Sequence, residues 1–125
     1  MNKLNNITVL TLYCLLIFWL SSRSVISTPM FFEHQDKVHH MGAYFIMGML
    51  TWRFFKDYIT STMKLSIVTL CFCSIYGLSD EWHQSFVPGR YADIMDWLAD
   101  TLGATIAIIS LYLTKIKLKT RGQTG

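Results

Sequence analysis

Residues 80–100 read DEWHQSFVPGRYADIMDWLAD and hold five of the chain's eight acidic residues, together with one histidine and one arginine. The rest of the chain is largely apolar. Of its 125 residues 52% are hydrophobic and 15% are charged, against about 25% charged residues in soluble domains. This length predicts a single domain. A chain of this kind, with its carboxylates gathered in one short segment, is typical of a membrane protein with a polar region at one end.

Four uncharged stretches separate the charged segments. Each spans roughly 14 to 19 residues, and flanking aromatic and basic residues extend each one towards the length of about 20 that a bilayer core requires. None carries a polar face broad enough for a soluble bundle. We therefore predict an all-α fold, an integral membrane bundle of four transmembrane helices in one domain, residues 1–125. The four stretches are Leu4–Ser22, Val38–Trp52, Leu65–Ser79 and Thr101–Thr114.

The basic residues predict the orientation of this bundle. Eight of the eleven Lys and Arg residues precede the first stretch, lie between the second and third, or follow the fourth. Because cytoplasmic segments carry the excess of Lys and Arg, we expect both termini to be cytoplasmic. Residues 115–125 are then a basic cytoplasmic tail, and the acidic segment faces the extracytoplasmic side.

The first apolar stretch allows a second interpretation. Lys3, the apolar run and the small residues around Ser24 and Ser27 also fit a secretory signal peptide. We expect the helix to be retained, because a small bundle needs it for packing. Cleavage would leave the orientation of the remaining helices unchanged.

The last three predicted helices each carry one face of small and polar residues. These faces are richest in charge at the extracytoplasmic end, and small residues on the last helix allow a neighbour to approach closely. We expect the three faces to point at one another, so that the carboxylates line a shared pocket. The residues, at helical spacings, are Asp36, His40, Tyr44; Ser66, Thr69, Cys73, Tyr76, Asp80, His83; and Asp93, Asp96, Asp100, Gly103, Ala107, Ser110.

A turn is predicted between the third and fourth helices. Pro88 followed by Gly89 favours a type II turn, and this turn is expected to hold Arg90 against the acidic helix ends. Arginine suits bidentate binding of carboxylate or phosphate. Asp93 alone is best explained as an N-terminal cap or an ion-pair partner of Arg90. Asp100 lies at the membrane boundary, where an ionisable residue is a functional candidate by default.

The order and spacing of these residues resemble the VanZ-like membrane protein family over about residues 15–110. The resemblance implies a small, multi-pass protein of the bacterial plasma membrane. The family takes its name from an accessory protein of glycopeptide-resistance clusters that is associated with resistance to teicoplanin. The matching pieces are Asp36-Lys37 with His40 and Tyr44, Tyr76-Gly77, Asp80-Glu81, Gln84, Pro88-Gly89-Arg90, Asp96 and Gly103-Ala104.

Three classes of function stay open. The preferred one is an envelope accessory protein that binds an anionic lipid-linked or cell-wall-related ligand, with Lys37 and Arg90 holding the head group. The second is an enzyme acting on a lipid-linked phosphate through acid–base groups, although no H-E-x-x-H or G-x-S-x-G motif occurs. The third is a purely structural membrane bundle. The sequence does not decide whether the chain is an enzyme.

The predicted site combines catalytic and ligand-binding candidates. Its donors match no named metal motif, so we assign no metal ligand, although a cationic or metal ligand stays open, and we name no cofactor. The expected partners are membrane lipid and an anionic envelope ligand; no nucleic-acid partner is expected, and the oligomeric state is open. The catalytic candidates are Glu81, Asp96 and His40, and the ligand-binding candidates are Asp36, Lys37, Tyr44, Asp80, Gln84, Arg90 and Asp100.

Overall fold

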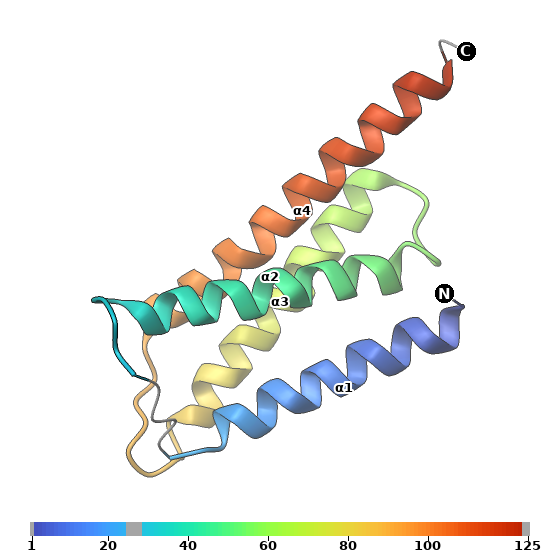
Figure 1. Cartoon of the computed structure of the whole chain (residues 1–125). Helices are drawn as coiled ribbons and strands as arrows, with labels where there is room; N and C mark the ends of the chain where they lie inside the picture. Colours follow the sequence, from blue (N-terminus) through green and yellow to red (C-terminus); the bar gives the residue numbers. More distant parts are fainter. Residues whose placement is uncertain (1, 25–28, 124–125) are drawn as a thin grey trace.

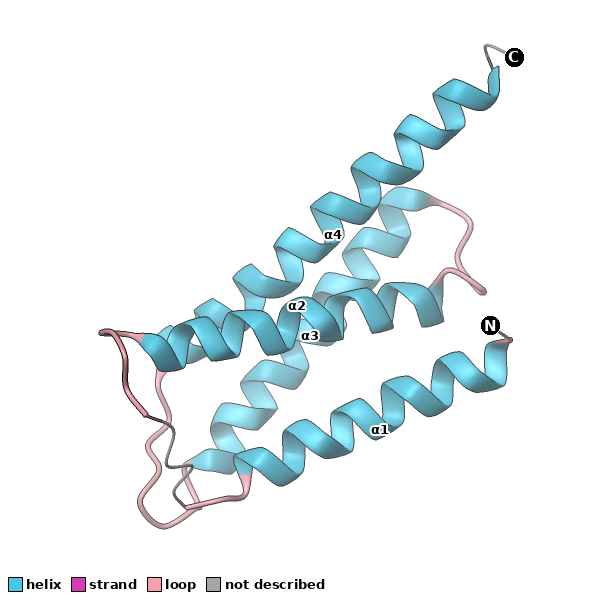
Figure 2. Ribbon diagram, viewed as in Figure 1, coloured by secondary structure: helices cyan, strands magenta, loops and turns pink. Residues whose placement is uncertain are grey.

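The computed structural model describes residues 2–24 and 29–123, and this part of the chain is helical with no strand (Figures 1 and 2). The all-α prediction is therefore confirmed, whereas Ser27 of the signal-peptide interpretation lies outside the described residues. The helices are α1 (Lys3–Ser21), α2 (Gln35–Phe55), α3 (Thr62–Gln84) and α4 (Ile94–Gln123).

Successive helices run in alternating directions, so that α1 and α3 end where α2 and α4 begin (Figure 1). At this end the Ser22 hydroxyl after α1 lies 3.0 Å from Nε2 of His83 on α3. At the opposite end Asn6 of α1 donates a hydrogen bond of 2.8 Å to Asp57, just beyond α2. We call the end where α2 and α4 begin the acidic end, because the carboxylates of residues 80–100 gather there.

Short polar side chains fix where three of the helices begin. Asn2 accepts a hydrogen bond from the backbone N–H of Asn5, and Ser61 accepts one from Lys64, as N-terminal caps do. Asp93 does the same for α4, with its Oδ1 2.8 Å from the Met95 nitrogen, so its predicted capping role is confirmed. The caps satisfy backbone donors that have no partner within the helix.

Three helices, α1, α3 and α4, are long and apolar enough to cross a membrane. Their outward faces carry large apolar side chains of a kind that soluble proteins rarely expose together. The prediction of a multi-pass helical membrane protein is therefore supported by α1, α3 and α4. Helix α2 is more polar, with two charged residues and two histidines in its first turns. The exposed side chains include Leu12, Leu15, Leu16, Ile67, Ile75, Leu78, Leu102, Ile106 and Ile109.

The fourth helix continues through the basic tail and projects past the other helices (Figure 1). The segment from 113 to 123 is exposed and still helical. A Lys- and Arg-rich helix end is favourable because the helix dipole places partial negative charge there. The tail therefore extends α4 away from the bundle at the end opposite the acidic residues.

Small residues bring α2 and α4 close together. Gly103 and Ala107 of α4 are buried, as the small-residue pattern predicts. Gly48 of α2 faces Ala107, since a Cβ at residue 48 would lie 3.1 Å from the Cβ of Ala107. Ser110, by contrast, is exposed and donates its hydroxyl hydrogen to the carbonyl of Ile106, so the buried face ends one turn earlier than predicted.

Gly103→Ala is expected to destabilise the protein by about 1–3 kcal/mol, because the added methyl group would collide with the backbone carbonyl of Met41. The matched control is Gly42→Ala, where a Cβ meets nothing within 4 Å. Alanine there should be neutral or stabilising by about 0.5–1 kcal/mol, since glycine disfavours helix interiors. Unfolding in mixed micelles, followed by circular dichroism, measures both. Equal stability of the two variants would contradict the close approach of α2 and α4.

Candidate functional site

The acidic end is joined by one lysine. The Nζ atom of Lys37, in the first turn of α2, lies 3.0 Å from Asp36 Oδ2, 2.7 Å from Asp93 Oδ2 and 2.5 Å from Asp96 Oδ1. An ammonium group has three donors, so these contacts use all of them. The side chain of Lys37 is 23% exposed, whereas that of Asp96 is 11% exposed. Lys37 therefore ties the start of α2 to the start of α4.

The electrostatics of this junction follow from the same contacts. Hydrogen bonding from the Lys37 ammonium lowers the pKa of Asp36 and of Asp93 below the ordinary carboxyl value. Burial by itself would lower the pKa of Lys37, but the hydrogen bonds to Asp93, Asp96 and Asp36 outweigh it and raise that pKa. The charged form of each group is therefore favoured in the folded protein.

One turn deeper, His40 of α2 meets Asp100 of α4. The His40 Nδ1 atom lies 2.8 Å from Asp100 Oδ1, and its Nε2 atom lies 3.7 Å from Asp96 Oδ2. Asp100 is fully buried, and its Oδ2 atom has no hydrogen-bond partner among the described residues. Gly77 of α3 makes room for it, because a Cβ there would lie 3.0 Å from Oδ2.

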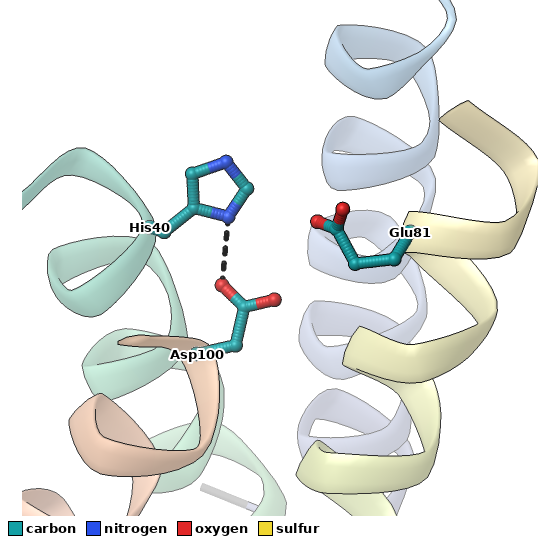
Figure 3. A group of neighbouring side chains, drawn as sticks. All are labelled: His40, Glu81 and Asp100. Atoms are coloured by element: carbon teal, nitrogen blue, oxygen red, sulfur yellow. Dashed lines mark hydrogen bonds and ion pairs between the residues drawn. The ribbon is translucent and has the colours of Figure 1, made fainter. Parts of the chain in front are cut away.

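Glu81 reaches the same region from α3. Its Oε2 atom accepts a hydrogen bond of 2.9 Å from the backbone N–H of Asp93. Its Oε1 atom is buried and has no partner within the described part of the chain. Figure 3 shows His40, Glu81 and Asp100 pointing towards one another from three helices, and one potential ligand atom of each lies within 4.8 Å of the others. We call these three residues the histidine–carboxylate cluster.

A cavity of about 250 Å³ lies beside this cluster, between α1, α2 and α3. Ile17, Leu20 and Ala43 form its apolar wall. Arg90 borders the cavity together with Asp80, whose carboxylate its charge attracts, but it makes no ion pair or side-chain hydrogen bond with any described residue. The polar lining consists of Ser21, His39, His40, Tyr44, Asp80, Gln84 and Arg90.

A second cavity, of about 330 Å³, lies between the ends of α1 and α3. Asp80 lines both cavities. His83 also borders the second one, and its ring stacks on Phe18 with centroids 4.5 Å apart. His83 therefore connects α3 to α1 instead of joining the histidine–carboxylate cluster.

The predicted turn is confirmed, and the three polar faces meet at their acidic ends, although Tyr76 and His83 of the α3 face contact α1 instead. The Arg90 backbone N–H donates to the Val87 carbonyl over 3.1 Å, and Gly89 has φ of 79°, the positive value that a type II turn requires at this position. Helices α2, α3 and α4 all contribute to one buried polar region.

The structure places all ten predicted site residues at the acidic end, in three settings. Asp36, Lys37 and Asp96 belong to the Lys37 junction, with Asp36 exposed at its rim. His40, Glu81 and Asp100 form the deeper cluster. The remaining four residues border the cavity: Tyr44, Asp80, Gln84 and Arg90. The hydroxyl group of the buried Tyr44 has no hydrogen-bond partner among the described residues. Their catalytic and ligand-binding roles stay predictions.

Two features of this arrangement differ from the sequence-based picture. Lys37 was expected beside an anionic ligand, but its donors are engaged by carboxylates. Arg90 was expected against the acidic helix ends; it borders the cavity, where its charge acts on Asp80 of α3, but it makes no ion pair with any described carboxylate. Asp93 was not among the predicted site residues. The signal that could have identified it is its position three residues before Asp96 at the start of a helix, because residues three apart lie on one helix face and can contact the same cation.

Fold and site together define a multi-pass helical membrane protein with buried carboxylates and a histidine at one end. The VanZ/LLP1 family model matches residues 3–115, and the chain belongs to that family. A Schizosaccharomyces pombe relative, the uncharacterized protein C11E3.10, is 33% identical over 94 residues that cover 70% of this chain. The chain spans about 56% of the length of that relative. No solved structure matches the chain.

Lys37→Met is expected to destabilise the protein by about 2–3 kcal/mol, because it leaves three carboxylates without their counter-ion at a partly buried junction. Lys56→Met is the control, since Lys56 is exposed and lies at the far end of α2. Chemical unfolding in micelles gives both values. A loss no larger than that of the control would show that the junction contributes little.

Acid is expected to weaken the same junction. The folded-state pKa values of Asp36 and Asp93 lie below the unfolded value of about 3.9, so their stabilisation is complete above that pH. It is lost as the pH falls through the lowered folded-state values. Melting temperatures between about pH 7 and about pH 2 should therefore fall more for the wild type than for Lys37→Met. Parallel curves would contradict the assignment.

Proposed function

We propose that this protein is an accessory protein of the cell envelope that binds the anionic head group of an amphiphile, either lipid-linked or cell-wall-related, at Arg90. The observation that carries the proposal is the guanidinium group of Arg90, which borders a cavity and has no ion-pair partner among the described residues. A guanidinium group binds phosphate or carboxylate through two parallel hydrogen bonds.

The walls of the cavities support an amphiphilic ligand. Ile17, Leu20 and Ala43 offer apolar surface next to the polar lining of the first cavity. The second cavity continues along the side where α1 packs only loosely on α3. Ligand sites of this kind combine apolar walls with a few polar groups that fix orientation. An acyl or isoprenoid chain would lie between α1 and α3 while the head group reaches Arg90.

The proposal includes four membrane spans with the site on the extracytoplasmic side. Helices α1 and α3 end together, so the chain between them has to return, and α2 is the segment that does so. Residues 38–55 at about 1.5 Å each reach about 27 Å, close to a hydrocarbon core of about 30 Å. The excess of Lys and Arg at the opposite end supports cytoplasmic termini.

If the protein lies in a bacterial plasma membrane, the family resemblance extends the proposal to resistance to glycopeptides such as teicoplanin. The relative in Schizosaccharomyces pombe, a eukaryote, favours a ligand that both kinds of cell contain. A lipid head group satisfies that condition. Resistance would then be one consequence of engaging an envelope lipid.

A second candidate function is an enzyme that acts on a lipid-linked phosphate. The observation that favours it is the 2.8 Å contact between His40 and the buried Asp100, with Glu81 opposite. A histidine held by a buried carboxylate is oriented for general acid–base chemistry. In this case Glu81→Gln would abolish turnover of the bound lipid while leaving its binding intact, whereas a binding protein would show no turnover in either form.

Arg90→Ala is expected to reduce retention of a specific head-group lipid by about tenfold or more, because a hydrogen bond to a charged group contributes about 1.5–3 kcal/mol. Lipid mass spectrometry of the purified protein measures the retained species. Arg23→Ala is the matched control: this arginine lies near the same end, outside both cavities, with its guanidinium carbon 4.2 Å from the ring centroid of Trp19. Identical lipid profiles for wild type and both variants would overturn the head-group site.

A further inference from the structure

We infer that His40, Glu81 and Asp100 form a binding site for a divalent transition-metal cation. The three residues come from α2, α3 and α4, and each offers one ligand atom within 4.8 Å of the other two. Figure 3 shows the three side chains converging. Ligands from three different helices surround a common point in a way that a single acidic helix face cannot.

Two buried oxygen atoms point to a bound cation. Asp100 is 0% exposed and Glu81 is 5% exposed, yet Asp100 Oδ2 and Glu81 Oε1 have no hydrogen-bond partner among the described residues. Buried polar atoms are normally hydrogen-bonded, and a buried charge without a partner is strongly unfavourable. One cation between the two carboxylates would satisfy both atoms.

Neither Lys37 nor Arg90 fills this role, and of these two carboxylates His40 contacts only Asp100, through Oδ1. Lys37 contacts Asp36, Asp93 and Asp96, and within the described chain it forms no ion pair with Glu81 or Asp100. Arg90 likewise makes no ion pair with either of them. The three donors of Lys37 are therefore used by the outer carboxylates, and Lys37 leaves the buried oxygens of the deeper layer without a cation.

The donor set indicates the class of metal. One imidazole nitrogen and two carboxylate oxygens suit Zn²⁺ and neighbouring first-row divalent ions better than Mg²⁺ or Ca²⁺, which prefer oxygen alone. Tetrahedral ligands at about 2.0–2.1 Å from an ion lie about 3.3 Å apart. The ligand atoms of His40, Glu81 and Asp100 lie within 4.8 Å of one another, so side-chain movements that shorten the longest spacing would admit the ion.

The surroundings of the cluster also resemble those of metal sites. Ligands are usually held by hydrogen bonds from a second layer of residues. Glu81 is held in this way by the backbone N–H of Asp93. His40 also borders the cavity that Arg90 lines, which leaves a side from which a further ligand can approach. The cation site does not depend on the proposed lipid. Only the idea that an anionic head group occupies the open side of the cation rests on the proposed function.

The test is a Co²⁺ titration of the full chain, purified in detergent and stripped with a chelator. Co²⁺ serves as a coloured substitute for Zn²⁺. We expect saturable binding of one equivalent, visible as ligand-field absorption and displaced by Zn²⁺. Glu81→Gln and Asp100→Asn should each weaken it about 100-fold or more, since even outer-layer changes cost 10–100-fold. Glu33→Gln, a carboxylate 90% exposed on the loop before α2, should bind like the wild type.

Three outcomes would overturn the site. Absence of saturable Co²⁺ binding in the wild type does so regardless of how the variants fold, and a protonated-carboxyl infrared band would then identify a proton as the occupant. Unchanged binding in both cluster variants would place the metal elsewhere. Lipid retention that depends on Arg90 in a wild type unable to bind Co²⁺ would reject the cation and leave the head-group proposal standing.

Discussion

The contacts of a single ammonium group, that of Lys37, hold the acidic end together. Carboxylates from α2, α3 and α4 converge there, and their mutual repulsion would separate the starts of α2 and α4. By binding Asp93 and Asp96 as well as Asp36, Lys37 converts that repulsion into an attachment between two helices. The rest of the site depends on the register that this attachment sets.

That register brings the deeper residues together. His40 follows Lys37 by three residues on α2, and Asp100 follows Asp96 by four on α4, so each pair shares one helix face. Once Lys37 meets Asp96, His40 necessarily lies near Asp100 one turn further in. Below them, the small residues of α2 and α4 keep the two backbones close. Charge at the surface and shape in the interior thus specify the same arrangement.

The result is two layers with different electrostatic character. The outer layer pairs its carboxylates with Lys37 and is complete in itself. The inner layer holds Glu81 and Asp100 with buried oxygens that lack partners, next to a cavity bordered by the unpaired Arg90. An outer layer whose lysine already uses all three of its donors on carboxylates suits a structural role. The inner layer and the cavity are where a ligand, whether a head group or a metal ion, gains the most.

Much of this architecture was predictable from the sequence. Residue spacings of three and four identified the polar faces, and Pro88-Gly89 identified the turn, because both depend on local geometry alone. Which carboxylates Lys37 contacts, and that Arg90 borders the cavity without an ion pair, was not predictable, since both depend on the depth and rotation of each helix. The space that Gly77 leaves for Asp100 is likewise a contact between helices that the sequence pattern does not encode.

The most direct test of the account is a double-mutant cycle between His40 and Asp100, with His40→Gln, Asp100→Asn and the combined variant unfolded in micelles. Residues in contact show coupling energies of about 0.5–3 kcal/mol, whereas distant residues add independently. The account predicts clear coupling between α2 and α4 at this pair. Additive effects of the two substitutions would contradict it, because the polar faces of the helices would then not meet where the structure places them.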